Sequence, residues 1–231
     1  MFRTRRAHER GHFDHGWLDT YHTFSFGDYQ DPHHMGFHGL RVMNEDTVAP
    51  ETGFGMHGHR EMEIVTYVLS GALAHRDSLG NGESLKAGEL QRMTAGTGIM
   101  HSEANPGPEP VHLYQIWIQP GTRGLAPSYE QKSFDPADRR GRFRAVVTPD
   151  AREGTLKINQ DATIYLGTFA QGEETEQPLA TGRSAWLQVL RGRVEAGGEN
   201  LSAGDGLAVS GESKLALAAS EDSEVMLFDL P

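Results

Sequence analysis

Short runs of β-branched and aromatic residues alternate with turn-forming residues along most of the chain. Glycine (28 residues) and proline (11 residues) separate these runs, and few segments show the 3.6-residue period of an amphipathic helix. We therefore predict an all-β sandwich or barrel, because an α/β fold needs helical patterns between its strands. The clearest predicted strands are Glu63–Leu69, His112–Ile118, Arg142–Thr148, Ala162–Phe169, Ala185–Leu190 and Glu224–Leu230.

This strand pattern occurs twice in the chain. YVLSG (67–71) is followed by KAGELQRM (86–93), and QVLRG (188–192) is followed by SAGDGLAV (202–209). In each copy a strand ends at glycine, a hairpin follows, and an Ala-Gly-acidic turn begins another strand; YQIWI and VMLFDL close the two copies. A connector rich in glycine, proline and charge lies at about residues 120–141. The repeat predicts two tandem domains, residues 1–130 and 131–231.

Composition limits the partners and the kind of site. The chain of 231 residues has no cysteine, which excludes disulfides, thiolate metal sites and iron–sulfur clusters. A formal net charge of −11 argues against direct nucleic-acid binding. The start MFRTRRAHERGHFDHGW lacks the apolar core of a secretory signal, and no run approaches the roughly 18 apolar residues of a membrane helix. We expect a cytoplasmic monomer without a membrane partner.

The histidines are confined to the first half of the chain. All 12 lie at or before His112, and the positions of the second repeat that correspond to His57 and His59 fall near Pro178 and Ala180. A histidine-based metal site therefore cannot form in the second repeat. We predict that only the first half binds metal.

Two short segments place histidines and glutamates at strand spacing. In GFGMHGHREMEIVTYVLSG, His57 and His59 are two residues apart and Glu63 follows four later, while AGTGIMHSEANP contains His101 and Glu103. Because side chains alternate along a strand, each set is expected to share a face. Imidazole and carboxylate ligands together suit Fe(II), Mn, Ni, Cu or Zn. Spacing alone does not separate Glu63 from Glu103 as the carboxylate ligand.

Other candidates are assigned to ordinary roles. The N-terminal histidines are expected to be solvated or hydrogen-bonded, His75 and His112 to be structural, and most of the nearby apolar residues to form core rather than to line a pocket. The N-terminal set is His8, His12, His15, His22, His33, His34 and His38, and the apolar set is Phe24, Phe26, Met35, Phe37, Met43, Met56 and Met93.

Four stretches, HTFSFGDYQDP, HGHREMEIVTYVLSG, AGTGIMHSE and LYQIWI, resemble the pirin family of the cupin superfamily. The resemblance covers nearly all of the first half and only weakly the second. It implies a bicupin of two tandem β-barrel or jelly-roll domains. It also implies one divalent metal, Fe(II) first, with Mn, Ni, Cu, Co or Zn as alternatives. The implied ligands are His57, His59, His101 and Glu103, with Glu63 behind them to orient an imidazole. Gly58 stands where relatives often have proline.

Pirins of this kind resemble quercetin 2,3-dioxygenases, which open a flavonol ring with dioxygen and release carbon monoxide. On this reading Glu103 is both ligand and general base, and Glu63 is the reserve base. The alternative is a metal-binding regulatory or redox-sensing module that acts through a protein partner, because the cupin fold does not decide function. A metal-assisted isomerase or decarboxylase is a third hypothesis.

Overall fold

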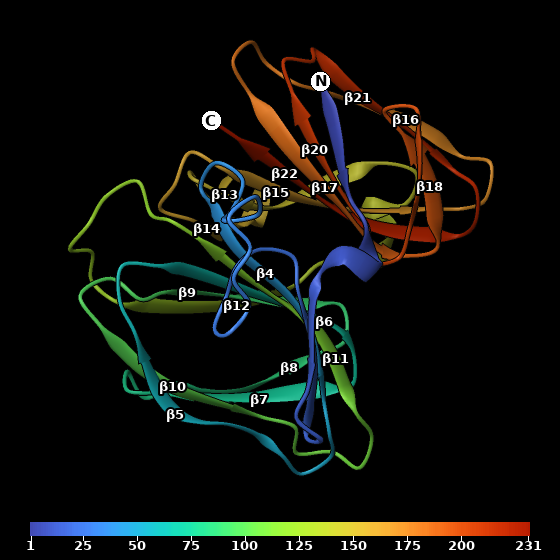
Figure 1. The fold of residues 1–231 in the computed structure, drawn as a ribbon. Helices are drawn as coiled ribbons and strands as arrows, with labels where there is room; N and C mark the ends of the chain where they lie inside the picture. The colour runs from blue at the N-terminus through green and yellow to red at the C-terminus, as the bar shows by residue number, and fades with distance from the viewer. The chain divides into compact units, whose positions relative to one another are not determined.

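A computed structural model describes every residue from Met1 to Pro231. Nearly all of its elements are β-strands, and its three helices are 3-10 turns of three or four residues. The all-β prediction is confirmed (Figure 1). None of the helices has the length and apolar character needed to cross a membrane.

The chain forms two compact units. The N-terminal unit consists of Gly11–Phe134 and Leu156–Gln160, and the C-terminal unit of Met1–Arg10, Asp135–Thr155 and Asp161–Pro231. The first ten residues belong to the C-terminal unit because β1 (Phe2–Arg5) pairs with β20 (Gly206–Ser210), as the blue strand in Figure 1 shows. The division predicted from the sequence, residues 1–130 and 131–231, had assigned these ten residues to the first domain.

The N-terminal unit contains a seven-stranded sheet in the order β12-β9-β6-β11-β4-β3-β2 and a four-stranded sheet in the order β5-β10-β7-β8. Its strands are β2 (Gly11–Asp14), β3 (Leu18–His22), β4 (Leu40–Val48), β5 (Gly53–His59), β6 (Glu63–Ser70), β7 (Ala72–Asp77), β8 (Gly82–Lys86), β9 (Glu89–Thr94), β10 (Ile99–Ala104), β11 (Val111–Ile118), β12 (Ser128–Ser133) and β14 (Leu156–Lys157).

In the C-terminal unit, β1-β20-β17-β22-β15-β13 pair in that order in one sheet and β16-β21-β18-β19 in a second. Its further elements are η1 (Ala7–Glu9), η2 (Pro136–Arg139), β13 (Phe143–Thr148), η3 (Arg152–Gly154), β15 (Thr163–Phe169), β16 (Glu174–Pro178), β17 (Ser184–Arg191), β18 (Arg193–Ala196), β19 (Glu199–Ser202), β21 (Lys214–Ala219) and β22 (Ser223–Leu230).

The strands predicted from the sequence agree with the structure to within one residue at each end. Alternate residues of a strand share a face: in β17, Ala185, Leu187 and Val189 join one buried apolar cluster of the C-terminal unit, and the residues between them are buried as well. The predicted connector is only partly irregular, because it contains β12, which pairs with β9.

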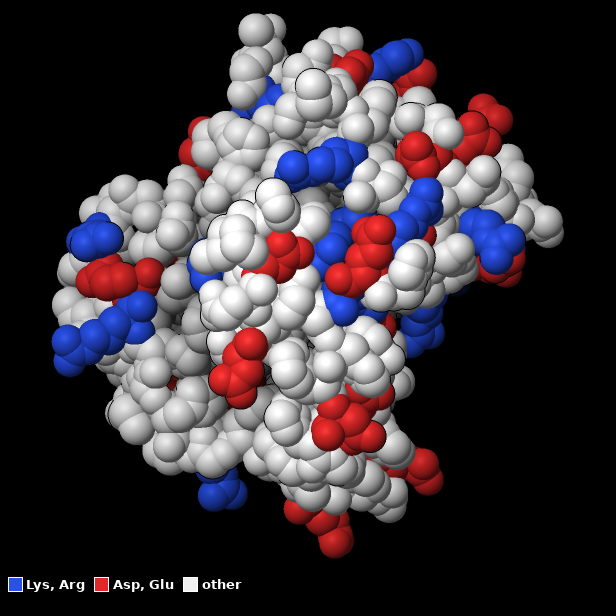
Figure 2. Space-filling view, viewed as in Figure 1, with Lys and Arg blue, Asp and Glu red and all other residues white.

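Charged side chains of both signs lie close together on the face shown in Figure 2. Ion pairs within the C-terminal unit include Arg6 with Glu199 at 2.7 Å and Arg183 with Asp229 at 2.6 Å. On this face the basic residues are therefore interspersed with acidic ones.

Candidate metal centre

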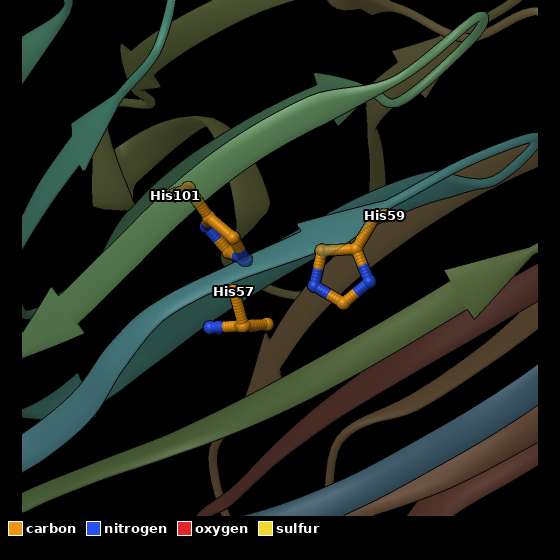
Figure 3. A group of neighbouring side chains, drawn as sticks. All are labelled: His57, His59 and His101. Carbon is orange, nitrogen blue, oxygen red and sulfur yellow. The ribbon is translucent and has the colours of Figure 1, made fainter.

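Three histidines meet on two neighbouring strands of the four-stranded sheet. β5 carries His57 and His59, β10 carries His101, and His57 is the register partner of His101 in the antiparallel pair. The ring centroids are 4.4 to 4.9 Å apart, and one nitrogen from each ring lies within 4.8 Å of the others. Figure 3 shows the three rings gathered around one space. The predicted convergence of these histidines is present.

His101 carries the strongest sign of a metal ligand. Its side chain is buried, yet neither ring nitrogen has a hydrogen-bond partner. Buried polar atoms are normally paired, so two orphaned nitrogens beside two other imidazoles fit a cation better than a packing role. His57 is oriented for the same purpose, because its Nδ1 donates to the Gly55 carbonyl at 2.8 Å and leaves Nε2 free to ligate.

The protonation of these rings favours metal binding. Burial, with the neighbouring imidazoles His57 and His75, lowers the pKa of His101 to about 3. Burial and the other two rings of the cluster lower the pKa of His59 to about 4. Both imidazoles are thus neutral at neutral pH, as a ligand must be.

Glu103 is buried on the same strand as His101 and is held by two amides. Gln91 donates through Nε2 to Oε1 at 2.8 Å, and Gln115 donates through Nε2 to Oε2 at 3.0 Å. Ligand atoms of Glu103, His101 and His75 lie within 4.8 Å of one another. The four predicted ligands therefore fall in two overlapping groups that share His101.

His75 was expected to be structural, and two of its contacts agree with that role. Its Nε2 lies 3.1 Å from Asp77 Oδ2, and its ring stacks on Tyr129 at 4.5 Å. Its Nδ1, however, is buried without a hydrogen-bond partner. Its place beside His101 and Glu103 was missed, although the alternation His75-Arg76-Asp77 on a strand was a usable signal.

Glu63 does not lie with the histidines as the shared-face argument expected. Its carboxylate accepts from Thr94 Oγ1 at 3.1 Å and from Asn159 N at 3.2 Å, not from an imidazole. The alternation of β5 does not continue into β6, because a turn at Glu61, with φ of 52°, separates the two strands and places them in different sheets. Burial raises the pKa of Glu63.

A cavity of about 430 Å³ adjoins the cluster. Its wall includes imidazoles, the Glu103 carboxylate, polar residues of β4 and four aromatic rings; the members are Trp17, Phe26, Asn44, Asp46, Gly53, Phe54, Gly55, His57, His59, Glu103, Gln115 and Trp117. Trp117 packs edge-on against His59 at 4.8 Å and Phe26 at 5.2 Å. The site thus joins a polar, metal-type cluster to an aromatic pocket.

Of the apolar residues assigned mainly to core, only Phe26 lines this cavity; Met35 and Met56 are exposed and the other four are buried. The N-terminal histidines join neither histidine group. His34 binds Asp31 at 2.7 Å, His12 binds Asp19 at 2.7 Å, and His112 binds Glu45 at 2.9 Å. These contacts agree with the ordinary roles expected for them.

Sequence reasoning also missed a row of polar side chains across the seven-stranded sheet. Gln91, Thr66, Gln115 and Asn44 are successive register partners on β9, β6, β11 and β4. Two of them hold Glu103, and Gln91 also donates to Thr66 Oγ1 at 2.9 Å. Polar residues at inward positions of apolar strands, as in YQIWI, were the available signal.

Comparison with known proteins places these features in context. Residues 1–118 match the family model for Pirin, and residues 145–230 match that for the quercetinase C-terminal cupin domain. The chain is 49% identical over 232 residues to quercetin 2,3-dioxygenase of Escherichia coli (strain K12), covering 100% of this chain and 99% of that protein. It is 43% identical over 220 residues to a pirin-like protein of Caulobacter vibrioides, covering 95% of each. The crystal structure of the bacterial pirin YhhW from Escherichia coli in complex with nickel(II) has a TM-score of 0.96 and 49% identity, and covers 100% of this chain and 99% of that one.

Proposed function

This chain belongs to the pirin family, and from that premise we propose that it is a metal-dependent dioxygenase that opens the central ring of a quercetin-like flavonol with O2 and releases carbon monoxide. The observation that carries the proposal is the cluster of His57, His59 and His101, with orphaned His101 nitrogens, beside an aromatic cavity. The name of the Escherichia coli relative at 49% identity supports the same activity.

The proposed ligands of one divalent metal are His57, His59, His101 and Glu103. Three imidazoles and one carboxylate suit Fe(II), which we favour, and also Mn, Ni, Cu, Co or Zn. The nickel(II) complex of the relative YhhW supports a divalent ion at such a centre. When bound, the metal would supply Lewis-acid stabilisation of the flavonol anion and its electronic coupling to dioxygen.

The cavity suits a flat aromatic substrate. Its volume of about 430 Å³ lies within the usual range of roughly 300–1,000 Å³ for small-molecule sites. Trp117, Phe26 and Phe54 would orient the rings and exclude water from the reacting edge. In this proposal the flavonol hydroxyl lies near Glu103, which lines the same cavity as the aromatic wall, His57 and His59.

Glu103 is the proposed base that takes the proton of the flavonol 3-hydroxyl. Each of its oxygens accepts an amide hydrogen, from Gln91 and from Gln115, which fixes the carboxylate while leaving further lone pairs available. Glu63, in contrast, binds Thr94 and Asn159 and does not line the cavity. We therefore assign the base role to Glu103 and keep Glu63 only as a comparison.

The test is oxygen consumption and carbon monoxide release by metal-loaded protein with quercetin. Anaerobic addition of quercetin should shift the flavonol absorption to longer wavelength, and Glu103→Gln should lower turnover by about 10²–10⁴. Metal content is measured beside the rate, and Glu63→Gln should keep its metal. If wild-type protein neither shifts the spectrum nor consumes oxygen with any flavonol, the regulatory-module hypothesis replaces this one.

A further inference from the structure

Two polar side chains of β4, Asn44 and Asp46, face the cavity of the proposed dioxygenase site. They are two residues apart on one strand and so share its inner face. β4 belongs to the seven-stranded sheet, whereas His57 and His59 come from β5 of the four-stranded sheet. The cavity therefore has polar groups contributed by both sheets, with Trp17, Phe54 and Trp117 also in its wall.

Asn44 has an unused acceptor. The residue is 4% exposed, and its Oδ1 is buried without a hydrogen-bond partner. An unpaired buried amide oxygen costs free energy that a donor from a ligand would recover. The neighbouring amide of Gln115 does not fill this role, because its Nε2 donates to Glu103 and Asn44 Oδ1 stays without a partner.

Asp46 is a carboxyl group in a setting that favours its neutral form. It is 4% exposed, and the Thr20 hydroxyl on β3 donates to its Oδ1 at 2.5 Å. Burial raises the pKa of Asp46 to about 7, and the carboxylates of Glu103 and Glu45 act in the same direction. The hydrogen bond from Thr20 and the neighbouring His112 oppose this rise. A protonated carboxyl both donates and accepts hydrogen bonds.

We infer that Asn44 and Asp46 form a second polar contact that selects an aromatic ligand bearing an uncharged hydroxyl in addition to its metal-binding edge. A phenol can donate to Asn44 Oδ1 and pair with the Asp46 carboxyl. An anionic substituent on that side would instead meet the carboxyl groups of Asp46 and Glu103, and the cavity wall contains no lysine or arginine to pair with it. This inference rests on the proposed function, since it names the specificity of the same cavity.

Binding, not turnover, tests the inference. Metal-loaded protein is titrated anaerobically with three ligands while tryptophan fluorescence is recorded, because Trp17 and Trp117 line the cavity. Quercetin carries several phenols, 3-hydroxyflavone keeps only the metal-binding edge, and a sulfonated quercetin adds an anion. Wild-type protein should bind quercetin about tenfold or more tighter than 3-hydroxyflavone, since a site built for a hydroxyl rejects analogues that lack it. The sulfonate should bind more weakly than quercetin.

Two variants test whether Asn44 and Asp46 of β4 cause this preference for a ligand with an uncharged hydroxyl. Asn44→Ala should weaken quercetin binding about tenfold and leave 3-hydroxyflavone unchanged. Asp46→Asn keeps the shape and removes the only group of this pair that can ionise, so it should lessen the rejection of the sulfonate by about tenfold. Thr47→Val, on the other face of β4, is the matched control and should change neither ratio.

The outcomes separate the two proposals. Unchanged ligand ratios in both variants, with oxygen consumption intact in the wild type, would overturn the inference and leave the dioxygenase proposal standing. Absence of both flavonol binding and oxygen consumption in metal-loaded wild type would overturn both. Metal content and circular dichroism of each variant show whether it is folded.

Discussion

The two halves of this molecule share a strand arrangement but fill it with opposite kinds of side chain. In the N-terminal unit a polar row crosses the sheet through register partners, and in the C-terminal unit the row at the corresponding strands is apolar apart from a tyrosine hydroxyl. The polar row is Gln91, Thr66, Gln115 and Asn44, and its counterpart is Leu207, Leu187, Leu227 and Tyr165. The correspondence follows the repeat in the sequence, which aligns YVLSG with QVLRG.

The second sheet shows the same contrast. β10 pairs with β5 as β21 pairs with β16. Where β10 buries His101 and Glu103, β21 buries Leu217 and Ala219. The two halves thus differ in the side chains at a few inward positions and not in the pairing of these strands.

The two units also differ in how their buried apolar residues are grouped. A single cluster in the C-terminal unit contains fifteen of its buried apolar residues. The inner face of the N-terminal unit includes a cluster of seven around Val68 and another of four around Ile64, and Thr66 lies between them on the same strand. Hydrogen-bonded side chains occupy the intervening space in the half that holds the site. A functional site thus interrupts the apolar core that its own fold would otherwise form.

The largest expected effect comes from removing the histidine that both groups share. His101→Ala should abolish stoichiometric metal binding, because it deletes the buried nitrogens without a hydrogen-bond partner. Elemental analysis of the purified protein measures this. His33→Ala is the control and should keep full metal; equal losses in the two variants would show that the N-terminal histidines are the real site.

Making the C-terminal unit resemble the N-terminal one should destabilise it. Leu227→Gln places an amide in an apolar cluster whose neighbouring positions, Leu187 and Tyr165, give it no row of amide partners. We expect the free energy of unfolding to fall by about 2–4 kcal/mol. Urea denaturation followed by hydrogen exchange in peptides of β22 measures the loss. Unchanged stability would mean that the apolar row is not needed for this half of the fold.

The converse substitution should weaken metal binding. Gln115→Leu removes one of the two amide donors to Glu103 and leaves Oε2 unpaired. Loss of a group that orients a ligand typically lowers metal affinity about 10–100-fold, and competition with a chelator measures the change. Gln188→Leu removes a buried amide in the C-terminal unit and should leave metal affinity unaltered. Equal metal affinity in Gln115→Leu and wild type would show that the Gln115 amide does not support metal binding.

The strands were predictable because local pattern determines them. β6, β11, β13, β15, β17 and β22 each begin and end within one residue of the predicted bounds. The pairing of β1 with the C-terminal unit was not predictable. Its sequence FRTR is polar and has no clear strand pattern, and its partner strand Gly206–Ser210 lies about two hundred residues away along the chain. Local sequence does not encode which distant edge a short strand will join.

The candidate site was predictable only where it depends on local strand pattern. His57, His59 and His101 meet because strand alternation and pairing bring them together. The support of Glu103 by Gln91 and Gln115 depends on the register of β9 and β11 and on how the side chains pack between the two sheets, which spacing along the chain does not give. The position of Glu63 was wrong for a related reason: a single turn at Glu61 ended the alternation on which the expectation depended.

The smallest expected effect is a difference between the halves in acid. His22 lies in the N-terminal unit, is 7% exposed, and has its pKa lowered to about 4, mainly by burial. The unfolded chain takes up this proton near pH 6.5 and the folded one does not, so acidification from pH 7 to pH 5 favours unfolding. The C-terminal unit has only the exposed His8 and lacks this contribution.

A variant isolates the effect, because the raised pKa of Asp46 acts in the opposite direction in the same unit. His22→Phe keeps an aromatic ring beside Phe13 and Phe26 but cannot take up a proton in either state. In metal-free protein its stability relative to wild type should rise by roughly 1–2 kcal/mol between pH 7 and pH 5. Hydrogen exchange should place this change in peptides of β3 and β4 and not in β17 or β22. A gap between variant and wild type that stays constant with pH would show that His22 is protonated alike in the folded and unfolded chain, and the acid sensitivity of the N-terminal half would then need another source.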